Sequence, residues 1–343
     1  MKLLLPRVPQ YFRTNLHTHT NITDASPTPE QMKEFYKKRG YQILCISDHN
    51  VIIDFSELND EDFLLLTGAE FNVNEENYQR GNSKSAHFNF IAKRPDNLWQ
   101  PFRYHKEWNS AAYLAKADID NMSQEHSAEA INAFIAEANK RGFLVMYNHP
   151  HWSLHSYEDY SKYKGLWAME LRNTGSAPYG DHDSGTVYRD LLNLGNRLFP
   201  VGADDSHSEK NVGGSWIMLG AEALTYEKAI EALEKGDFYA SCGPEIHDLY
   251  MEGTELFFRC SDVSSVTIES GLRFAAREKA VEPLKLLRSG KIDMKKWFDH
   301  CRDGDERNEN RTWFRVVFHG PYGDYASTRA FWYDEFSEKE CAR

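Results

Sequence analysis

The stretch YFRTNLHTHTNITDASPTPEQMKEFYKKRGYQILCISDH, residues 11–49, contains one complete strand–helix–strand unit. Residues 11–16 and 41–47 are β-rich, and residues 28–39 form an amphipathic helical pattern with Pro29 in the first turn and Gly40 after the last. Further β-rich runs lie at residues 63–70, 87–92, 143–148, 166–171 and 198–203, with a second helical pattern at residues 127–140. This alternation predicts βαβ units and a mainly parallel α/β sheet. Seven such strands over roughly 235 residues favour a barrel over an open sheet.

The pattern changes after Gly243-Pro244. Short β patterns follow at residues 246–251, 256–259, 265–269, 313–319 and 326–333, with a strong turn signal at residues 320–323. Residues 277–301 look partly helical, and residues 302–311 (RDGDERNENR) read as a charged loop. We therefore predict a barrel domain at residues 8–243 and a small β-sandwich-like domain at residues 244–343.

The composition excludes several classes of protein. The chain has 343 residues and a formal charge of −12, which argues against binding long nucleic acids, because that affinity depends on Lys and Arg neutralising phosphates. The five cysteines never form a C-x-x-C pair, so we expect reduced thiols. The start MKLLLPRVPQ lacks the apolar run of a signal peptide. We expect a soluble, cytoplasmic protein with no membrane partner.

Histidines and acids follow the predicted strands. In an extended segment His17 and His19 point the same way and could bind one ion together, with Asp24 in the next loop. Asp205 and His207 repeat this spacing after another apolar strand. A single pair of this kind could equally be two solvent-facing histidines at the end of a strand. The recurrence favours a metal site.

Other strand ends carry the same residue types. We predict His49 as a ligand and its neighbour Asp48 as a residue that orients an imidazole through the other ring nitrogen. Glu70 and His149 also end apolar runs. His87 has the weakest pattern, because it begins its run; a half-buried structural histidine is the alternative there, as a solvated loop acid is for Glu70. Loops after the carboxyl ends of barrel strands meet at one mouth, so these residues should converge.

Nine residues are too many for one tetrahedral ion and suit two or three divalent ions with a bridging carboxylate. Imidazole and carboxylate ligands without thiolates favour zinc, manganese or iron. The predicted ligands are His17, His19, Asp24, His49, Glu70, His87, His149, Asp205 and His207.

The order HTHT, SDH, Glu70, His87, NHP and DSH resembles the PHP (polymerase and histidinol phosphatase) superfamily of metal-dependent phosphoesterases. This resemblance implies a distorted (β/α)7 TIM-like barrel. It also implies one ion at His17, His19, Glu70 and Asp205, a second at Asp24, His49 and His207, and a third at Glu70, His87 and His149. Residues 236–244, with the pattern G-x-F-Y-x-S-x-G-P, resemble the junction in a two-domain branch of the superfamily, whose members also include carbamate and ester hydrolases. Residues 277–301 depart from that branch.

The leading functional hypothesis is hydrolysis of a small phosphomonoester by a metal-bound hydroxide. Arg172 could bind the phosphate and His151 could protonate the leaving group, although a rim salt bridge and a surface imidazole are the alternative interpretations. Hydrolysis of a carboxylic ester or carbamate at the same metal site stays open, as does a structural metal cluster. The expected partner is a small phosphate ester. Homo-oligomer formation and the role of the second domain stay unassigned.

Overall fold

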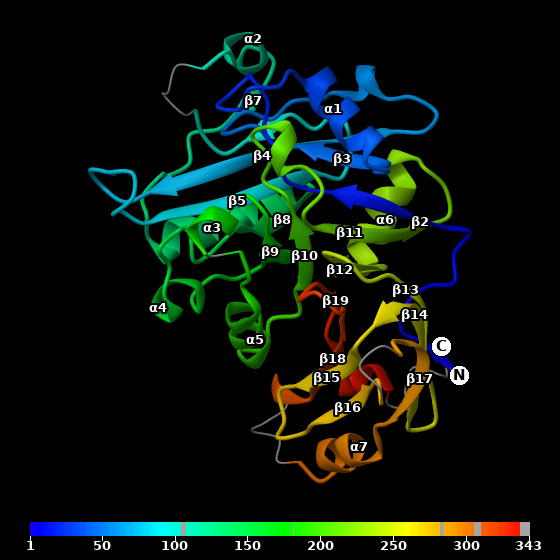
Figure 1. The fold of residues 1–343 in the computed structure, drawn as a ribbon. Helices are drawn as coiled ribbons and strands as arrows, with labels where there is room; N and C mark the ends of the chain where they lie inside the picture. The colour runs from blue at the N-terminus through cyan, green and yellow to red at the C-terminus, as the bar shows by residue number, and fades with distance from the viewer. Residues whose placement is uncertain (104–107, 181, 282–284, 305–309, 337–343) are drawn as a thin grey trace.

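The computed structural model describes residues 1–103, 108–180, 182–281, 285–304 and 310–336. A large mixed sheet runs in the order β10-β9-β8-β5-β4-β3-β2-β11-β12-β19-β18-β15-β16, and β20 pairs with β18 (Figure 1). Its strands in the first part of the chain are β2 (Gln10–Asn15), β3 (Ile43–Ile46), β4 (Leu64–Asn74), β5 (Ser85–Ala92), β8 (Phe143–Tyr147), β9 (Ala168–Asn173), β10 (Phe199–Ala203), β11 (Trp216–Ala221) and β12 (Phe238–Ser241). All seven predicted strands occur, and β11 and β12 are additional.

Strand direction differs from the mainly parallel prediction at two places: around β5, and at β11, which is antiparallel to both β2 and β12. The pairs β2–β3, β3–β4, β8–β9 and β9–β10 are parallel, whereas β5 is antiparallel to both of its neighbours, β4 and β8. The hairpin between β4 and β5 imposes this reversal, because a short connection joins antiparallel strands only.

A closed barrel of paired strands is not found among the described residues. The strand β10 pairs with β9 alone, and the sheet continues from β2 into β11 and β12. Beyond the ends of β2 and β10 an isolated bridge joins Thr18 to Ser206. The backbone N–H of Asp205 donates to the His17 carbonyl and that of His19 to the Ser206 carbonyl, both at 2.9 Å. The sheet therefore curls until backbone hydrogen bonds join its two sides at the end that carries the histidines.

Helices cover the curled sheet. The longer ones are α1 (Pro29–Lys38), α3 (Ala128–Lys140), α5 (Gly185–Asn193) and α6 (Tyr226–Lys235). Thr28 caps α1 in a capping box with Gln31, and Pro29 occupies the first turn, as the sequence predicts. Shorter elements are α2 (Ala111–Leu114), α4 (Tyr157–Tyr160), β6 (Trp99–Gln100), β7 (Asp118–Ile119), η1 (Ser56–Leu58), η2 (Ala177–Tyr179) and η3 (Glu209–Asn211). Apolar side chains of α3, such as Phe134 and Ile135, are fully buried in the main core.

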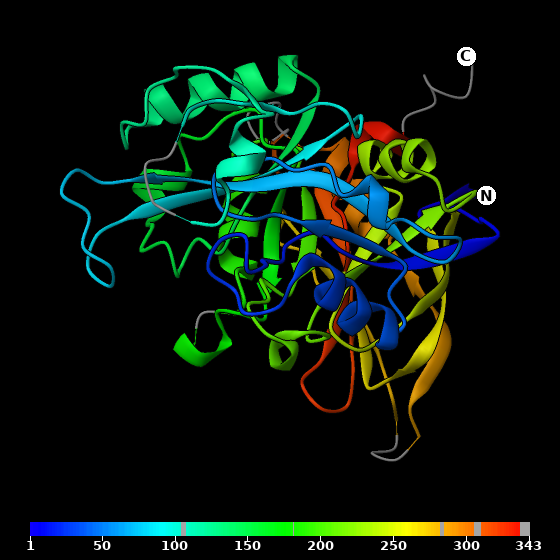
Figure 2. The same cartoon turned by 90° about the horizontal axis from the view of Figure 1, so that it is seen from above.

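The second half of the chain builds a separate core between two sheets. β1 (Lys2–Leu3), β13 (Ile246–Glu252), β14 (Glu255–Val263) and β17 (Leu287–Asp293) form one sheet; β15 (Ser265–Ser270), β16 (Ala276–Lys279), β18 (Trp313–His319), β19 (Tyr325–Thr328) and β20 (Phe331–Trp332) extend the large one. Trp297 of α7 (Lys295–Arg302) lies fully buried in this core, and η5 (Tyr333–Phe336) follows β20. Figure 2 shows the N-terminal strand beside the second domain, where Lys2 pairs with Met251.

The predicted domain boundary falls between β12 and β13 and stays a prediction, since β12 pairs with β19 across it. In the described part of residues 277–301, the helix is α7, and β16 and β17 precede it. In the predicted charged loop, residues 305–309 lie outside the described residues, as does Cys341. The four described cysteines are free thiols. No helix in the described part of the chain has the length and apolar character needed to cross a membrane.

Candidate metal centre

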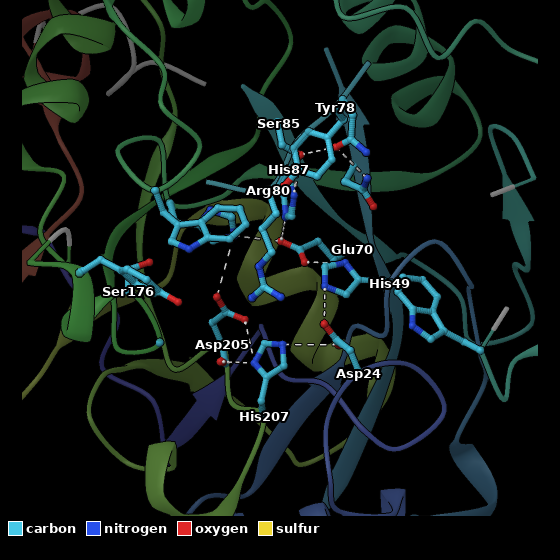
Figure 3. A pocket seen from close by; sticks show the side chains of 17 residues that line it. Asp24, His49, Glu70, Tyr78, Arg80, Ser85, His87, Ser176, Asp205 and His207 are labelled. Atoms are coloured by element: carbon cyan, nitrogen blue, oxygen red, sulfur yellow. Dashed lines mark hydrogen bonds and ion pairs between the residues drawn. The ribbon is translucent and has the colours of Figure 1, made fainter. Parts of the chain in front are cut away.

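All nine predicted ligands converge at one end of the curled sheet. Figure 3 labels Asp24, His49, Glu70, His87, Asp205 and His207 among them. Their donor atoms fall into four groups, each within 4.8 Å: His17, His19 and Asp205; His19, Asp24, His49 and His207; His49, Glu70 and His87; and His17, Glu70 and His149. The first two groups contain most of the first ligand set and all of the second set that the family resemblance implies. Glu70 belongs to both of the others, as expected of a bridging residue.

The antiparallel direction of β5 explains the position of His87. His87 is the third residue of β5 and faces Asn72 of β4 in the strand register. Because β5 runs opposite to its neighbours, the beginning of β5 lies at the edge where β3 and β8 end. The feature that made His87 the weakest candidate in the sequence is therefore the one that places it in the centre.

Glu70 lies at the middle of the cluster and is 1% exposed. Five imidazoles surround it: Oε1 lies 3.0 Å from His87 Nδ1, 3.1 Å from His149 Nε2 and 3.3 Å from His17 Nε2, and Oε2 lies 3.1 Å from His49 Nδ1 and 3.5 Å from His19 Nε2. The Asn148 amide also donates to Oε1 at 2.7 Å. A buried carboxylate in this position needs compensating positive charge.

The other two carboxylates occupy the opposite side of the cluster. Asp205 Oδ1 lies 3.1 Å from His19 Nε2 and 3.4 Å from His17 Nε2. Asp24 approaches the second ligand set, with His49 Nε2 and His207 Nε2 each 3.5 Å from one of its oxygens. Each carboxylate thus faces two or more imidazole nitrogens.

The hydrogen bonding of His87 tests whether this arrangement fits a cation. Ser85 Oγ donates to Asn74 Oδ1 at 2.6 Å, so it accepts from His87 Nε2, which lies 2.9 Å away. This assignment places the lone pair of His87 Nδ1 toward Glu70 Oε1, and the buried Nδ1 has no hydrogen-bond partner there. Two acceptors 3.0 Å apart repel each other unless a proton or a metal cation satisfies both, and burial lowers the pKa of His87, which disfavours the proton. The residues present therefore fit a metal ion.

Outer hydrogen bonds fix two more imidazoles in the same way. His17 Nδ1 lies 2.6 Å from Glu170 Oε1, and His207 Nδ1 lies 3.1 Å from the Asp205 carbonyl oxygen. In each case the remaining Nε2 faces the cluster, which is the usual arrangement of a histidine that ligates metal.

Glu170 is fully buried in β9 and also accepts from the backbone N–H of His149 at 2.9 Å. Our sequence analysis missed it. An acid inside the apolar run of residues 166–171 was the available signal.

The pKa values of the ligands differ across the cluster. Although burial opposes protonation, neighbouring carboxylates raise the pKa of His17, His49 and His149, and that of His207 to about 9, so an ion would displace protons from these imidazoles. Burial, reinforced by His207 and His49, lowers the pKa of His19 to about 4, so this imidazole is neutral near pH 7. Burial opposes ionisation of Glu70 and Asp205, but the surrounding imidazoles hold both pKa values well below their ordinary range. Neutral imidazole and ionised carboxylate are the forms that bind metal.

The backbone is held in an uncommon conformation around the centre. His149, Asp205 and Asn50 have φ values of 23°, 51° and 56°. Left-handed backbone costs energy for residues other than glycine and is concentrated at functional sites. Gly175 permits the close packing, because a Cβ there would lie 2.8 Å from the Asp205 carbonyl oxygen.

Three predicted supporting residues are placed differently from our expectation. Among the described residues, no imidazole is hydrogen-bonded to the carboxylate of Asp48; it accepts from the Thr20 N–H at 2.8 Å and from the Thr20 and Thr23 hydroxyls at 2.5 and 2.6 Å. It thus holds the loop after His19. Neither His151 nor Arg172 lines the cavity over the centre, and the Arg172 guanidinium lies over the Tyr325 ring instead.

A cavity of about 480 Å³ opens over the centre. Its described lining includes several residues that sequence patterns did not indicate: Asn72, Asn74, Tyr78, Arg80, Ser85, Trp108, Trp152, Gly175, Ser176 and Tyr179. Trp108 stacks on His49 with ring centroids 5.6 Å apart, and Trp152 packs edge-on against His149 at 4.9 Å. The volume is in the range of small-molecule sites.

Comparison with known proteins gives structural likeness only. No model of a protein family matches the chain, and no curated protein matches it. A two-domain protein from Bacteroides vulgatus, described as containing a predicted PHP-like metal-dependent phosphoesterase, is similar over 96% of this chain and 98% of its own, with 14% identity and a TM-score of 0.45. A protein from Bifidobacterium adolescentis, assigned by prediction as a metal-dependent phosphoesterase, matches 67% of this chain and 96% of its own, with 17% identity and a TM-score of 0.36.

A lesion-specific endonuclease from Pyrococcus furiosus matches 66% of this chain and 56% of its own, with 12% identity and a TM-score of 0.40.

Proposed function

We propose that the chain is a metal-dependent hydrolase that cleaves a small phosphomonoester at a centre of two or three divalent ions. Six imidazoles and three carboxylates supply the donors, a set that suits zinc, manganese or iron. His17, His19, Glu70 and Asp205 would hold one ion, Asp24, His49 and His207 a second, and Glu70, His87 and His149 a third. Such ions lower the pKa of water and neutralise charge that develops on a phosphoryl group.

The observation that carries this proposal is the pairing of acceptors around Glu70. His87 Nδ1 presents a lone pair to a carboxylate oxygen that is itself an acceptor, in a site where both are buried. Because protein groups alone leave this contact unsatisfied, it supports a cation-binding role over a structural cluster of histidines.

Two buried carboxylates that are not proposed ligands position the metal-ligating residues. Glu170 orients His17 and binds the backbone of His149, so one buried carboxylate connects two ligands. Asp48 performs the corresponding task for the loop of Thr20 and Thr23. Preorganisation of this kind matters because misplacing a catalytic group by about 1 Å can cost 100-fold in rate.

The test is turnover of p-nitrophenyl phosphate by the full chain with added Mn²⁺ or Zn²⁺, before and after chelation. We expect metal-dependent hydrolysis that falls at least about 100-fold in His17→Ala and Asp205→Ala, since outer partners of ligands alone cost 10- to 100-fold. His247→Ala, an exposed histidine of the second domain, is the matched control and should match the unmodified protein.

An aryl carboxylic ester is assayed in parallel. Metal-independent turnover, or faster hydrolysis of the ester than of the phosphate, would contradict the proposal.

A further inference from the structure

The cavity wall extends beyond the proposed ligands along one face of the β4–β5 hairpin. Side chains in a strand alternate, so Glu70, Asn72 and Asn74 of β4 share a face. In the strand register Asn72 is opposite His87, and Asn74 is opposite Ser85. All five of these residues line the cavity. The hairpin that supplies Glu70 and His87 therefore continues outward as a polar wall.

The connection between β4 and β5 places a positively charged side chain at the cavity. Tyr78 and Arg80 lie between β4 and β5, and both line the cavity. Figure 3 shows the Arg80 side chain pointing into the space bounded by Glu70, Asp205 and His207. Arg80 is the only lysine or arginine among the described lining residues.

Contacts with the rest of the protein hold this connection in place. Lys84 Nζ lies 2.8 and 3.0 Å from the two carboxylate oxygens of Asp159, and the Lys84 N–H donates to Glu75 Oε2 at 2.8 Å. Within the connection, the Gln79 N–H donates to Ser83 Oγ at 3.0 Å. These contacts anchor the backbone of the connection that carries Arg80.

The surroundings favour a strong interaction between Arg80 and an anion. Trp108 and Trp152 pack against ligand imidazoles and supply apolar walls to the cavity. Arg80 is exposed at the cavity mouth, and its planar guanidinium matches two oxygens of a phosphate. Among the described residues, no carboxylate forms an ion pair with Arg80, so its charge is not already neutralised by a described acid.

We infer that Arg80 is the phosphate-binding residue of the cavity, pairing through its guanidinium with phosphoryl oxygens of a substrate held at the metal centre. This inference rests on the proposed phosphoesterase function and adds a determinant of specificity to it. It gives to Arg80 the role that the sequence suggested for Arg172, whose guanidinium lies over the Tyr325 ring. A monoester dianion has three terminal oxygens, so two can pair with Arg80 while the third faces the ions.

The experiment compares Arg80→Gln and Arg80→Lys with Arg94→Gln in the full chain loaded with Mn²⁺ or Zn²⁺. Arg94 is the matched control, because its side chain is 77% exposed and its ion-pair partner is Asp96. Isothermal titration with inorganic phosphate measures binding directly, and p-nitrophenyl phosphate gives KM and kcat. Metal content and the melting temperature are measured for every variant.

We expect Arg80→Gln to weaken phosphate binding and raise KM by about 10- to 100-fold, with metal content and melting temperature unchanged. Arg80→Lys should recover part of the loss, because it keeps the charge but not the planar fork. Arg94→Gln should leave both constants unchanged.

Phosphate binding by Arg80→Gln within twofold of the unmodified protein overturns the inference about Arg80 and leaves the proposed function standing. Loss of metal or of thermal stability in that variant also overturns it, since it would indicate a structural role. If the unmodified, metal-loaded protein binds no phosphate and hydrolyses no phosphate ester, the proposed function and the inference both fail.

Discussion

The substitution Glu170→Gln tests a residue that positions the proposed metal ligands but is not itself one of them. Glu170 is fully buried, with Oε1 2.6 Å from His17 Nδ1 and Oε2 accepting from the His149 N–H at 2.9 Å and the Asn173 amide at 2.8 Å. Glutamine preserves the volume, but its amide group is a donor and must face at least one of these donors. We expect His17 or His149 to move from its position.

The expected loss is 10- to 100-fold in metal affinity, equivalent to about 1.4 to 2.7 kcal/mol, the usual effect of removing a carboxylate that orients a ligating histidine. Competition with a chromogenic chelator for Zn²⁺ or Mn²⁺ measures this affinity, with circular dichroism as a check on folding. Glu158→Gln, at an exposed position, is the matched control. An affinity within twofold of the unmodified protein in Glu170→Gln would refute the proposed coupling between Glu170 and the ligands.

Three further substitutions test the placement of supporting residues. His151→Ala and Arg172→Ala should each leave kcat/KM for p-nitrophenyl phosphate within about threefold, because neither side chain lines the cavity; a loss of 100-fold would restore their predicted catalytic roles. Gly175→Ala should reduce turnover by about tenfold or more, since its Cβ would displace Asp205; unchanged kinetics would show that this contact yields freely. Asp48→Asn should destabilise the protein by about 1 to 3 kcal/mol in urea unfolding, and an unchanged midpoint would contradict its role in holding the loop.

Most strands could be predicted from the sequence because their apolar runs and the adjacent helix signals are local. The predicted helical pattern of residues 28–39, with Pro29 in its first turn, corresponds to α1, which Thr28 caps in the structure. The direction of β5 and the incomplete closure between β2 and β10 depend on pairings between segments far apart in the chain. A pattern of residue types carries no information on such pairings, so the mainly parallel closed barrel was only partly correct.

The candidate ligands could be predicted because histidine and acid residues at strand ends are an unusual pattern. The supporting residues could not, because adjacency in sequence does not show which group a side chain meets. Asp48 is next to His49 in sequence, but its carboxylate accepts from Thr20 and Thr23. Glu170 and Arg80 reach the site from the middle of a strand and from a hairpin connection, where neither residue stands out locally.

The most direct measurement is the metal content of the full chain after loading with Zn²⁺ or Mn²⁺ and removal of free ions, determined by plasma mass spectrometry. We predict two or three ions per chain, and a loss of at least one ion in Glu70→Gln, because Glu70 contacts five of the six candidate imidazoles. Less than one ion per chain under every loading condition, or an unchanged content in Glu70→Gln, would contradict the assignment of these nine residues to a metal centre.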